Sequence, residues 1–309
     1  MGRTVLVGST GFVGGNLLAS HAFDAACHST DVADQFGKDN DLVVYAGVPA
    51  AMYLANRDPE ADLSVMRAAR ENLRRLNAKQ TVLVSSIAVY ADSRGRTEAD
   101  EPAGAGLAPY GANRLRLEQW VREDFENALI VRLPALYGRG LKKNFLYDLH
   151  TVAPAMLRPD KYRELAAKSD LVAAGYADGG NGFYKLTGAV DAAALRAWFS
   201  QNDWNALHFT DSRWVYLFSD LAGLWGHIET ALAAGLRVLN LATPPVSAAA
   251  VYRAVRGGTF KNELPGAPFD YDMRTEHAAL FGGAGGYLCT EEEELAGIRR
   301  FMKNWEGQA

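Results

Sequence analysis

The chain has few cysteines, no excess of basic residues and no long apolar run. Among its 309 residues there are two cysteines, Cys27 and Cys289, too few for a disulfide framework or a thiolate metal cage. We expect both thiols to be buried or without function. The formal net charge of −4 argues against nucleic-acid binding by a basic surface.

Membrane and metal functions are also disfavoured. No apolar run reaches the roughly 18 residues of a membrane helix, and the N-terminus leads directly into a strand pattern rather than a signal peptide. The sequence therefore predicts a cytoplasmic protein with no membrane partner. The six histidines never pair at metal-ligand spacing, so no metal site is predicted. The 49% of hydrophobic and 22% of charged residues are typical of a globular protein.

Short apolar runs alternate with helical stretches through the first half of the chain. The predicted strands are 4–7, 24–28, 41–46, 80–85 and 129–133, and the predicted helices are 12–20, 59–77 and 114–126. Strands separated by helices indicate βαβ units and a parallel sheet. The expected fold class is therefore α/β, a Rossmann-like doubly wound parallel sheet.

The pattern changes after about residue 140. Residues 151–205 are Ala-rich and helix-like but interrupted at 177–182, and further strands are predicted at 215–218 and 237–242, with helices at 221–234 and 290–305. The length allows one large domain or two closely joined ones. We predict a dinucleotide-binding Rossmann domain from 1–150 plus 206–245. A smaller, mostly helical substrate-binding lobe is predicted from 151–205 plus 246–309.

Three glycines follow the first predicted strand at the spacing Gly-x-x-Gly-x-x-Gly and open a helix. In this context Gly8 permits a tight turn, Gly11 lets the backbone approach a pyrophosphate, and Gly14 lets the helix sit close to the strand. The helix N-terminus offers free N–H groups and a partial positive charge to phosphates. The segment therefore predicts binding of a nicotinamide dinucleotide.

Further motifs follow in chain order. They are Ser85-Ser86-Ile87-Ala88-Val89-Tyr90, Tyr110-Gly111-Ala112-Asn113-Arg114, Arg132-Leu133-Pro134-Ala135-Leu136-Tyr137-Gly138, and the stretch from Ser212 to Ala222. With the glycine segment, they resemble the extended branch of the short-chain dehydrogenase/reductase superfamily, the NAD-dependent epimerase/dehydratase family. The resemblance covers about 1–145 and 206–250, and it hardly extends to 151–205.

The resemblance implies a set of site residues. The implied catalytic residues are Ser86, Tyr110 and Arg114. The implied cofactor-binding residues are Gly8, Ser9, Thr10, Gly11, Phe12, Val13, Gly14, Ser29, Asp31, Ala46, Gly47 and Pro134. Asn144 and Arg213 stand where the family contacts the diphosphate of its substrate, and an arginine fork matches phosphate oxygens. A surface ion pair is the alternative for Arg213.

The implied chemistry is proton movement at the oxygen of a carbinol or carbonyl during hydride transfer. Tyr110 would be the acid/base, and Ser86 would hydrogen-bond the same oxygen. A cation one helical turn along, Arg114, would favour the ionised tyrosine. The alternative for Tyr110 and Arg114 is a surface helix start with a solvated cation.

Several positions depart from the family pattern. Arg114 replaces the family's lysine and cannot give up its proton, so we expect redox-neutral reactions to suffer less than net dehydrogenation. Ser29 stands at the position of the ribose-binding acid, with Asp31 two residues later, so NAD or NADP remains open with a lean to NAD. Ala135 replaces a substrate-contacting asparagine. The family's early-helix asparagine is absent, and Asp62 or Ser64 occupies that region.

The leading functional hypothesis is an NAD(P)-dependent enzyme of the epimerase/dehydratase type. It would act on a hydroxyl or carbonyl carbon of a small-molecule substrate, a nucleotide-linked sugar. A reductase of a non-sugar carbonyl is the second hypothesis, favoured by Ala135 and Trp214. A non-catalytic dinucleotide-binding sensor or scaffold is the third. A homodimer is expected from the family alone.

Overall fold

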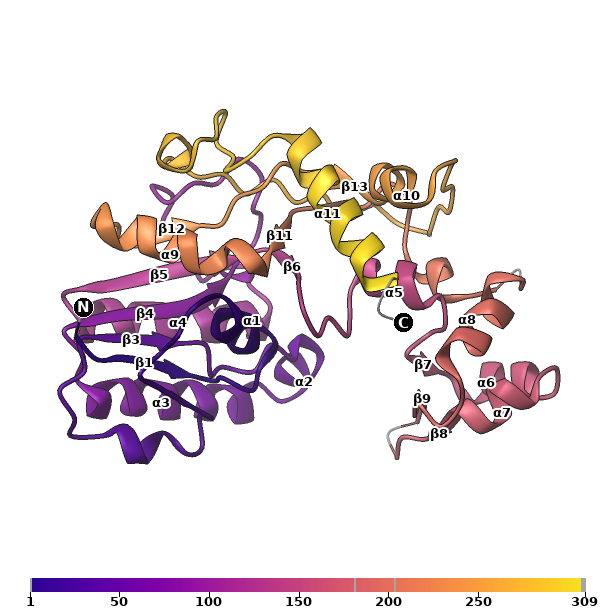
Figure 1. Ribbon diagram of the computed structural model, residues 1–309, viewed down its shortest axis with the longest axis horizontal. Coiled ribbons are helices and arrows are strands. Elements are labelled where there is room, and N and C mark those ends of the chain that lie inside the picture. Colours follow the sequence, from indigo (N-terminus) through magenta and orange to yellow (C-terminus); the bar gives the residue numbers. More distant parts are fainter. Residues whose placement is uncertain (1, 181, 203, 307–309) are drawn as a thin grey trace. The chain divides into compact units, whose positions relative to one another are not determined.

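The computed structural model describes residues 2–180, 182–202 and 204–306, and the chain divides into two compact units (Figure 1). The first unit comprises residues 1–140, 215–246 and 270–297. The second comprises 141–214, 247–269 and 298–309. None of the helices in the described part of the chain is long and apolar enough to cross a membrane.

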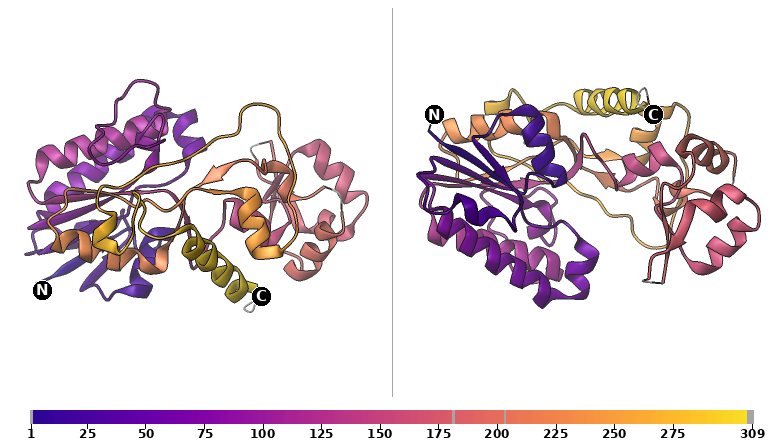
Figure 2. Two further views of the ribbon diagram at one scale, coloured as in Figure 1. Left: turned by 90° about the horizontal axis from the view of Figure 1, so that it is seen from above. Right: turned by 60° about the horizontal axis from the view of Figure 1, so that its bottom comes forward.

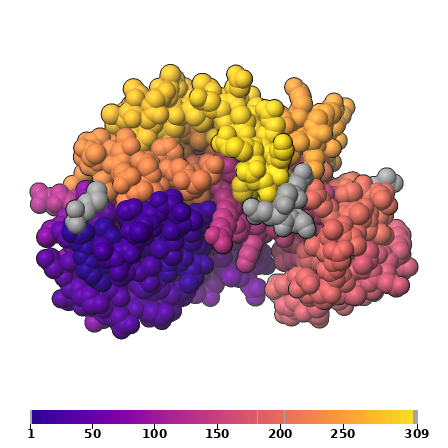
Figure 3. All heavy atoms as spheres, in the orientation of Figure 1, coloured from indigo at the N-terminus to yellow at the C-terminus, as the bar shows by residue number. Residues whose placement is uncertain are grey.

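The two compact units do not coincide with the predicted domains. Residues 141–150 and 206–214 lie in the second unit, and residues 246 and 270–297 lie in the first. The carboxylate of Glu98 explains the last assignment, because it accepts hydrogen bonds from the Asn240 backbone N–H and the Thr275 hydroxyl, both at 2.7 Å. These bonds fix the late segment to the end of the sheet. Figure 3 shows its gold and yellow atoms beside the orange helix at 224–233.

A six-stranded parallel sheet forms the centre of the first unit, as the sequence predicts. Its strands are β1 (Thr4–Val7), β2 (Ala25–Cys27), β3 (Leu42–Tyr45), β4 (Gln80–Ser86), β5 (Ala128–Leu133) and β12 (Val238–Asn240). They lie in the order β12-β5-β4-β3-β1-β2. β2 lies on one side of β1, and the chain then crosses to form β3 on the other side. The carboxyl ends of β1 and β3 therefore form the switch point where such sheets bind ligands.

Helices cover both faces of this sheet (Figures 1 and 2). One face carries α1 (Phe12–Ser20) and α9 (Leu224–Ala233), and the other carries α3 (Pro59–Leu76) and α4 (Pro109–Asp124). β1, β3 and β5 are buried on both sides, which explains their continuous apolar runs. The predicted helix at 114–126 begins five residues earlier than expected, with Pro109 in its first turn, where a missing N–H has no cost.

Shorter elements connect these layers. The short helical segments are η1 (Val32–Gln35), α2 (Met52–Arg57), η2 (Ile87–Val89), η4 (Leu221–Gly223) and η5 (Ala278–Phe281). The short strands are β6 (Ala135–Tyr137), β10 (Val215–Tyr216), β11 (Phe218–Asp220) and β13 (Val246–Ser247). β6 pairs with β11 in parallel, and β10 pairs with β13.

The second unit is mostly helical, as expected, but also contains a small antiparallel sheet. Its helices are α5 (Phe145–Thr151), α6 (Pro159–Ala166), α7 (Asp170–Gly175), α8 (Ala192–Ser200), η3 (Ala206–Phe209) and α10 (Ala248–Arg256). The sheet has the order β7 (Met156–Leu157), β9 (Tyr184–Leu186), β8 (Tyr176–Asp178). The predicted break at 177–182 overlaps β8 at residues 177–178, and residue 181 lies outside the described residues. Strands of two or three residues are too short for a period-2 pattern. The last helix, α11, runs over Glu291–Glu306.

A buried ion pair joins β5 to α4. Arg132 and Glu118 are both fully buried, and Nη2 of Arg132 lies 2.7 Å from Oε2 of Glu118. The Ser85 hydroxyl donates to the same carboxylate at 2.5 Å, and Nη1 of Arg132 donates to the Tyr90 hydroxyl at 2.6 Å. Asn240 contacts that hydroxyl at 3.3 Å. Three strands, one helix and the chain after η2 therefore meet at one charge pair.

Removal of the Glu118 charge should destabilise the fold strongly. Glu118→Gln leaves Arg132 buried without its counterion, a change that costs about 3–5 kcal/mol of unfolding free energy. The matched control is Glu123→Gln, because the Glu123 side chain is 65% exposed and lies 3.6 Å from Arg70. That change should cost at most about 1 kcal/mol. Urea denaturation followed by tryptophan fluorescence measures both, and equal effects would contradict the assigned role.

A second buried acid lies at the start of α11. Glu294 is 5% exposed, and its Oε2 lies 3.8 Å from Sγ of Cys289. Burial raises the pKa of Glu294 to about 8 and that of the Cys289 thiol to about 12. Glu294 therefore binds a proton more tightly in the folded chain than in the unfolded one. Its contribution to stability is lost as the pH rises from about 4.5 to about 8.

Glu294→Gln should remove this pH dependence. The variant is expected to gain stability relative to the parent protein as the pH rises from 5 to 9, since the amide has no proton to lose. Thermal unfolding followed across this range measures the difference. Glu292→Gln, at an exposed position on the same helix, serves as the control and should run parallel to the parent. A Glu294→Gln difference that stays constant with pH would refute the assignment.

Candidate active site

The turn after β1 requires two of its glycines for steric reasons. Gly8 has a φ of +90°, and a Cβ there would lie 2.6 Å from the carbonyl carbon and oxygen of Ala46. A Cβ on Gly14 would lie 2.2 Å from the carbonyl oxygen of Gly8. Gly8 thus lets the turn close against the end of β3, and Gly14 lets α1 pack on the turn, as the sequence predicts.

The third glycine leaves the start of α1 open. Gly11 is the N-cap residue, is exposed, and has no side chain to cap the first-turn N–H groups. Ser9 and Thr10 form the turn before it, and Phe12 and Val13 begin the helix. Open N–H groups at a helix N-terminus bind phosphate oxygens. The residues present therefore fit the pyrophosphate of a dinucleotide.

Other predicted cofactor residues gather beside this turn. The Gly8 N–H donates to the Cys27 carbonyl at the end of β2 at 2.8 Å. A Cβ on Gly47 would lie 3.0 Å from Cβ of Ser29, so the ends of β2 and β3 are in contact as well. The Asp31 carboxylate is exposed and accepts from the Thr30 hydroxyl at 2.9 Å. Pro134 is buried directly after β5, at the same edge of the sheet.

Ser86 and Tyr110 lie on elements that touch. Ser86 ends β4, and its hydroxyl accepts from the Ala88 N–H at 3.2 Å at the start of η2. Tyr110 is the second residue of α4. Between them, a Cβ on Gly111 would lie 2.0 Å from the Ala88 carbonyl oxygen. The glycine after the tyrosine therefore allows α4 to begin directly against η2, a role that sequence reasoning missed.

Arg114 lies against the ring of Tyr110 but is not a free cation. Its guanidinium carbon is 3.9 Å from the ring centroid, and the side chain is 5% exposed. Nη1 donates to Oδ2 of Asp62, and Nη2 donates to the Pro49 carbonyl oxygen at 2.5 Å. The cation one turn from the tyrosine, which the sequence predicts, is present but paired with a carboxylate. The alternative of a solvated surface cation is wrong, because Arg114 is buried.

Two asparagines hold this end of α4 against α2 and α3. Oδ1 of Asn56 accepts from the Tyr110 N–H at 2.9 Å. Nδ2 of Asn113 donates to Oδ2 of Asp62 and to the Pro59 carbonyl, both at 2.9 Å. Asp62 therefore accepts from two residues of α4, and its place in the first turn of α3 favours its negative charge. No motif of the family marks Asn56, whereas the sequence already places Asp62 in this region.

The two predicted substrate residues lie in the second unit. The Asn144 side chain accepts from the N–H groups of Leu146 and Tyr147 at 3.0 and 3.3 Å and thereby caps α5. Nε and Nη2 of Arg213 bind the two carboxylate oxygens of Asp211 at 2.9 and 2.6 Å. The ion pair that the sequence left as an alternative for Arg213 is thus formed, and it holds the pKa of Asp211 well below its usual range.

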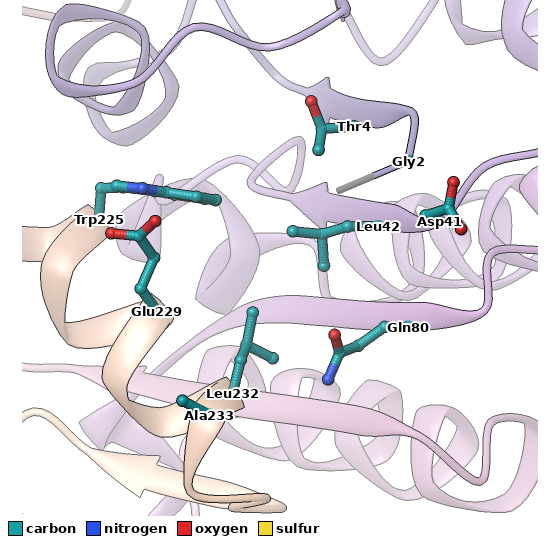
Figure 4. Close-up of a pocket in the computed structure, with 9 residues that line it drawn as sticks. All are labelled: Gly2, Thr4, Asp41, Leu42, Gln80, Trp225, Glu229, Leu232 and Ala233. Atoms are coloured by element: carbon teal, nitrogen blue, oxygen red, sulfur yellow. The ribbon is translucent and has the colours of Figure 1, made fainter.

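An apolar pocket of about 280 Å³ in the first unit lies away from these residues (Figure 4). It is lined by the first residues of β1, β3 and β4 and by one side of α9, with Thr4, Leu42, Gln80 and Trp225 among its walls. The strands are parallel, so this is the amino edge of the sheet, opposite the glycine turn. The pocket is therefore not the candidate active site. The described residues contain no cluster of potential metal ligands.

Comparisons with known proteins agree with this architecture. The family model described as the RmlD substrate binding domain matches residues 3–158, and the chain belongs to this family. The match confirms the resemblance to extended short-chain dehydrogenase/reductase proteins. No curated protein sequence matches the chain significantly.

Solved structures share the fold over nearly the whole chain at low identity. A dTDP-4-dehydrorhamnose reductase from Bacillus anthracis in complex with NADP has a TM-score of 0.63 and 14% identity, and 98% of each chain is covered. An NAD-dependent NDP-hexosamine 5,6-dehydratase involved in tunicamycin biosynthesis has a TM-score of 0.62 and 14% identity, with 99% of this chain and 98% of that chain covered. A UDP-glucose 4-epimerase from Thermotoga maritima has a TM-score of 0.57 and 12% identity, with 99% of each covered. They confirm the α/β fold.

Proposed function

We propose that the protein is an NAD(P)-dependent enzyme that acts on a hydroxyl or carbonyl carbon of a nucleotide-linked sugar. One observation carries the proposal. The phosphate-binding turn after β1, Ser86 at the end of β4 and the Tyr110–Arg114 contact at the start of α4 all occur at the carboxyl edge of one parallel sheet. Ligands bind at this edge in such sheets. Bound NAD(P) would supply or accept the hydride.

The chain's own residues divide the remaining work. Tyr110 would give a proton to, or take one from, the reacting oxygen, and Ser86 would hydrogen-bond that oxygen. The glycine turn and the start of α1 would hold the pyrophosphate. The named relatives include a reductase, a dehydratase and an epimerase, and nucleotide-linked sugars are common to them. This shared substrate class supports the proposal, while the particular reaction is open among the three.

Either NAD or NADP suits the described loop after β2. Asp31 would repel a 2′-phosphate and accept from a ribose hydroxyl, which supports the lean to NAD. One neighbour is titled as a complex with NADP and another as NAD-dependent. Mass spectrometry of nucleotides released by denaturing the purified protein, followed by titration with NADH and NADPH, would identify the cofactor. Absence of binding to both would overturn the proposal.

A second candidate is a reductase of a non-sugar carbonyl. The Arg213–Asp211 pair favours it, because both carboxylate oxygens already take the donors that a phosphate would use. Turnover of simple ketones or aldehydes without turnover of sugar nucleotides would select this candidate. A dinucleotide-binding sensor, the third hypothesis, would bind cofactor and turn over neither class.

The Gly14 position gives a direct test of the cofactor site. Gly14→Ala is expected to weaken NAD(P)H binding at least tenfold, because its Cβ would lie 2.2 Å from the Gly8 carbonyl oxygen and displace the turn. Gly15→Ala is the matched control, since its Cβ would lie 3.8 Å from the nearest atom outside the helix. Fluorescence titration with NADH and NADPH measures both. Similar affinities for the two variants would place the cofactor elsewhere.

Tyr110→Phe tests catalysis separately from binding. We expect turnover to fall about 10²–10⁴-fold, the usual contribution of a general acid or base, with cofactor affinity unchanged. The assay follows NAD(P)H absorbance, or product formation for redox-neutral reactions, with dTDP-, UDP- and GDP-linked sugars. Tyr53→Phe, at a 70% exposed position on α2, is the control. Full activity of Tyr110→Phe would remove Tyr110 from the mechanism.

We propose a cytoplasmic protein, in keeping with the two free, half-buried cysteines. We also propose a homodimer, which sedimentation of the purified chain would test.

A further inference from the structure

The surroundings of Tyr110 contain a carboxylate that the catalytic motif does not include. Asp62 binds the Arg114 guanidinium, and that guanidinium lies on the Tyr110 ring. We propose that Asp62 and Arg114 form a neutral pair that presents no net charge to the Tyr110 hydroxyl, so that Tyr110 serves as a proton donor to a carbonyl oxygen. Asp62 is then a positioning and charge-balancing residue that acts through Arg114.

The Asp62–Arg114 pair is buried, which strengthens the electrostatic effect of each charge on Tyr110. The side chains of Arg114 and Asp62 are 5% and 10% exposed. Charges in such surroundings are weakly screened by water and salt, so each partner's field reaches the tyrosine. The pair is also fixed on both sides, because Asn113 donates to the same oxygen of Asp62 and the Pro49 carbonyl accepts from Arg114. Arg114 is therefore held in place by more than its attraction to Asp62.

The other charges near this end of α4 do not replace the pair. The main elements packed against α4 are α2, α3, η2, β4 and β5. η2 and β4 carry no ionisable side chain. The remaining groups on α2, α3 and β5 are exposed or paired elsewhere: Tyr53, Arg57, Asp58, Glu60, Arg67, Arg70, Glu71, Arg74, Arg75 and Arg132. On α4 itself, Glu118 is paired with Arg132.

The inference rests on the proposed function and narrows it. Tyr110 would donate its hydroxyl proton to the carbonyl oxygen, and bound NAD(P)H would supply the hydride that completes reduction of the carbonyl to an alcohol. The tyrosine then regains a proton from water. An oxidation would instead need tyrosinate as the base, which an unbalanced cation favours. The paired geometry therefore leaves Tyr110 without the unbalanced cation that would favour tyrosinate, and it suits the proton-donor role in carbonyl reduction.

Titration of Tyr110 in charge variants tests the pair without substrate or cofactor. In protein labelled with ¹³C-tyrosine, the Tyr110 resonance is identified by its loss in Tyr110→Phe. Asp62→Asn should lower the Tyr110 titration midpoint by about one pH unit, because the cation is unbalanced. Arg114→Met should raise it by a similar amount. The double variant should titrate within a few tenths of a unit of the parent.

Asp124→Asn is the matched control, because Asp124 at the end of α4 pairs with Arg70 and Arg74. It should leave the Tyr110 midpoint unchanged. If Asp62→Asn does not fold, Arg114→Lys against Arg114→Met tests the same charge, and only the methionine variant should shift. An unchanged Tyr110 midpoint in both Asp62→Asn and Arg114→Met, or shifts of that midpoint in the same direction, would contradict the proposed charge balance.

The outcomes separate this inference from the proposed function. In an active enzyme, the alkaline limb of the reduction profile should move to lower pH in Asp62→Asn by the same unit as the titration. Full turnover by Tyr110→Phe would defeat the proposed function, while the titration would still report on the pair. Midpoint shifts of Tyr110 in opposite directions for Asp62→Asn and Arg114→Met, together with the expected loss of turnover in Tyr110→Phe, would support both the charge pair and the proposed function.

Discussion

The buried pair of Arg132 and Glu118 is the interaction on which the rest of the site depends. Glu118 lies two helical turns after Tyr110 on α4, with Arg114 between them, so the three residues share one helix face. The contact of Glu118 with Arg132 on β5 fixes the rotation of α4 about its own axis and the position of the helix along the strands. The position of Tyr110 beside the end of β4 is therefore set by a charge pair two turns away.

Close backbone contacts at two glycines also help to position the helices around the site. Glycine at position 14 brings α1 onto the turn after β1, and glycine at position 111 brings α4 onto η2. Any larger residue would push a helix away from a strand end. Both helices approach the same edge of the sheet, so close contacts at Gly14 and Gly111 bring the glycine turn and Tyr110 to one region. The motif glycines thus allow the close approach of the helices, and the motif polar residues lie where the helices and strand ends meet.

Sequence reasoning predicted the elements of the sheet well and the surroundings of its charges poorly. Apolar runs buried on both faces and glycine spacing are local signals, so β1, α1 and the turn between them could be identified. The partner of Arg114 is 52 residues away in the chain and has no periodic signal. Glu118 could have been found, because it continues the four-residue spacing of Tyr110 and Arg114. The short strands of the second unit leave no detectable pattern.

The same arrangement recurs at each motif arginine. Arg132 binds Glu118, Arg114 binds Asp62, and Arg213 binds Asp211, which is 1% exposed. A buried cation is costly without a counterion, so the fold supplies one for Arg132 and for Arg114 from a neighbouring helix. Arg213 is exposed, and there the buried partner is the Asp211 carboxylate. A linear motif shows the cation and usually omits its counterion. The electrostatic role of a motif arginine therefore belongs to the pair, and a charge inferred from sequence alone overstates the field at the reacting group.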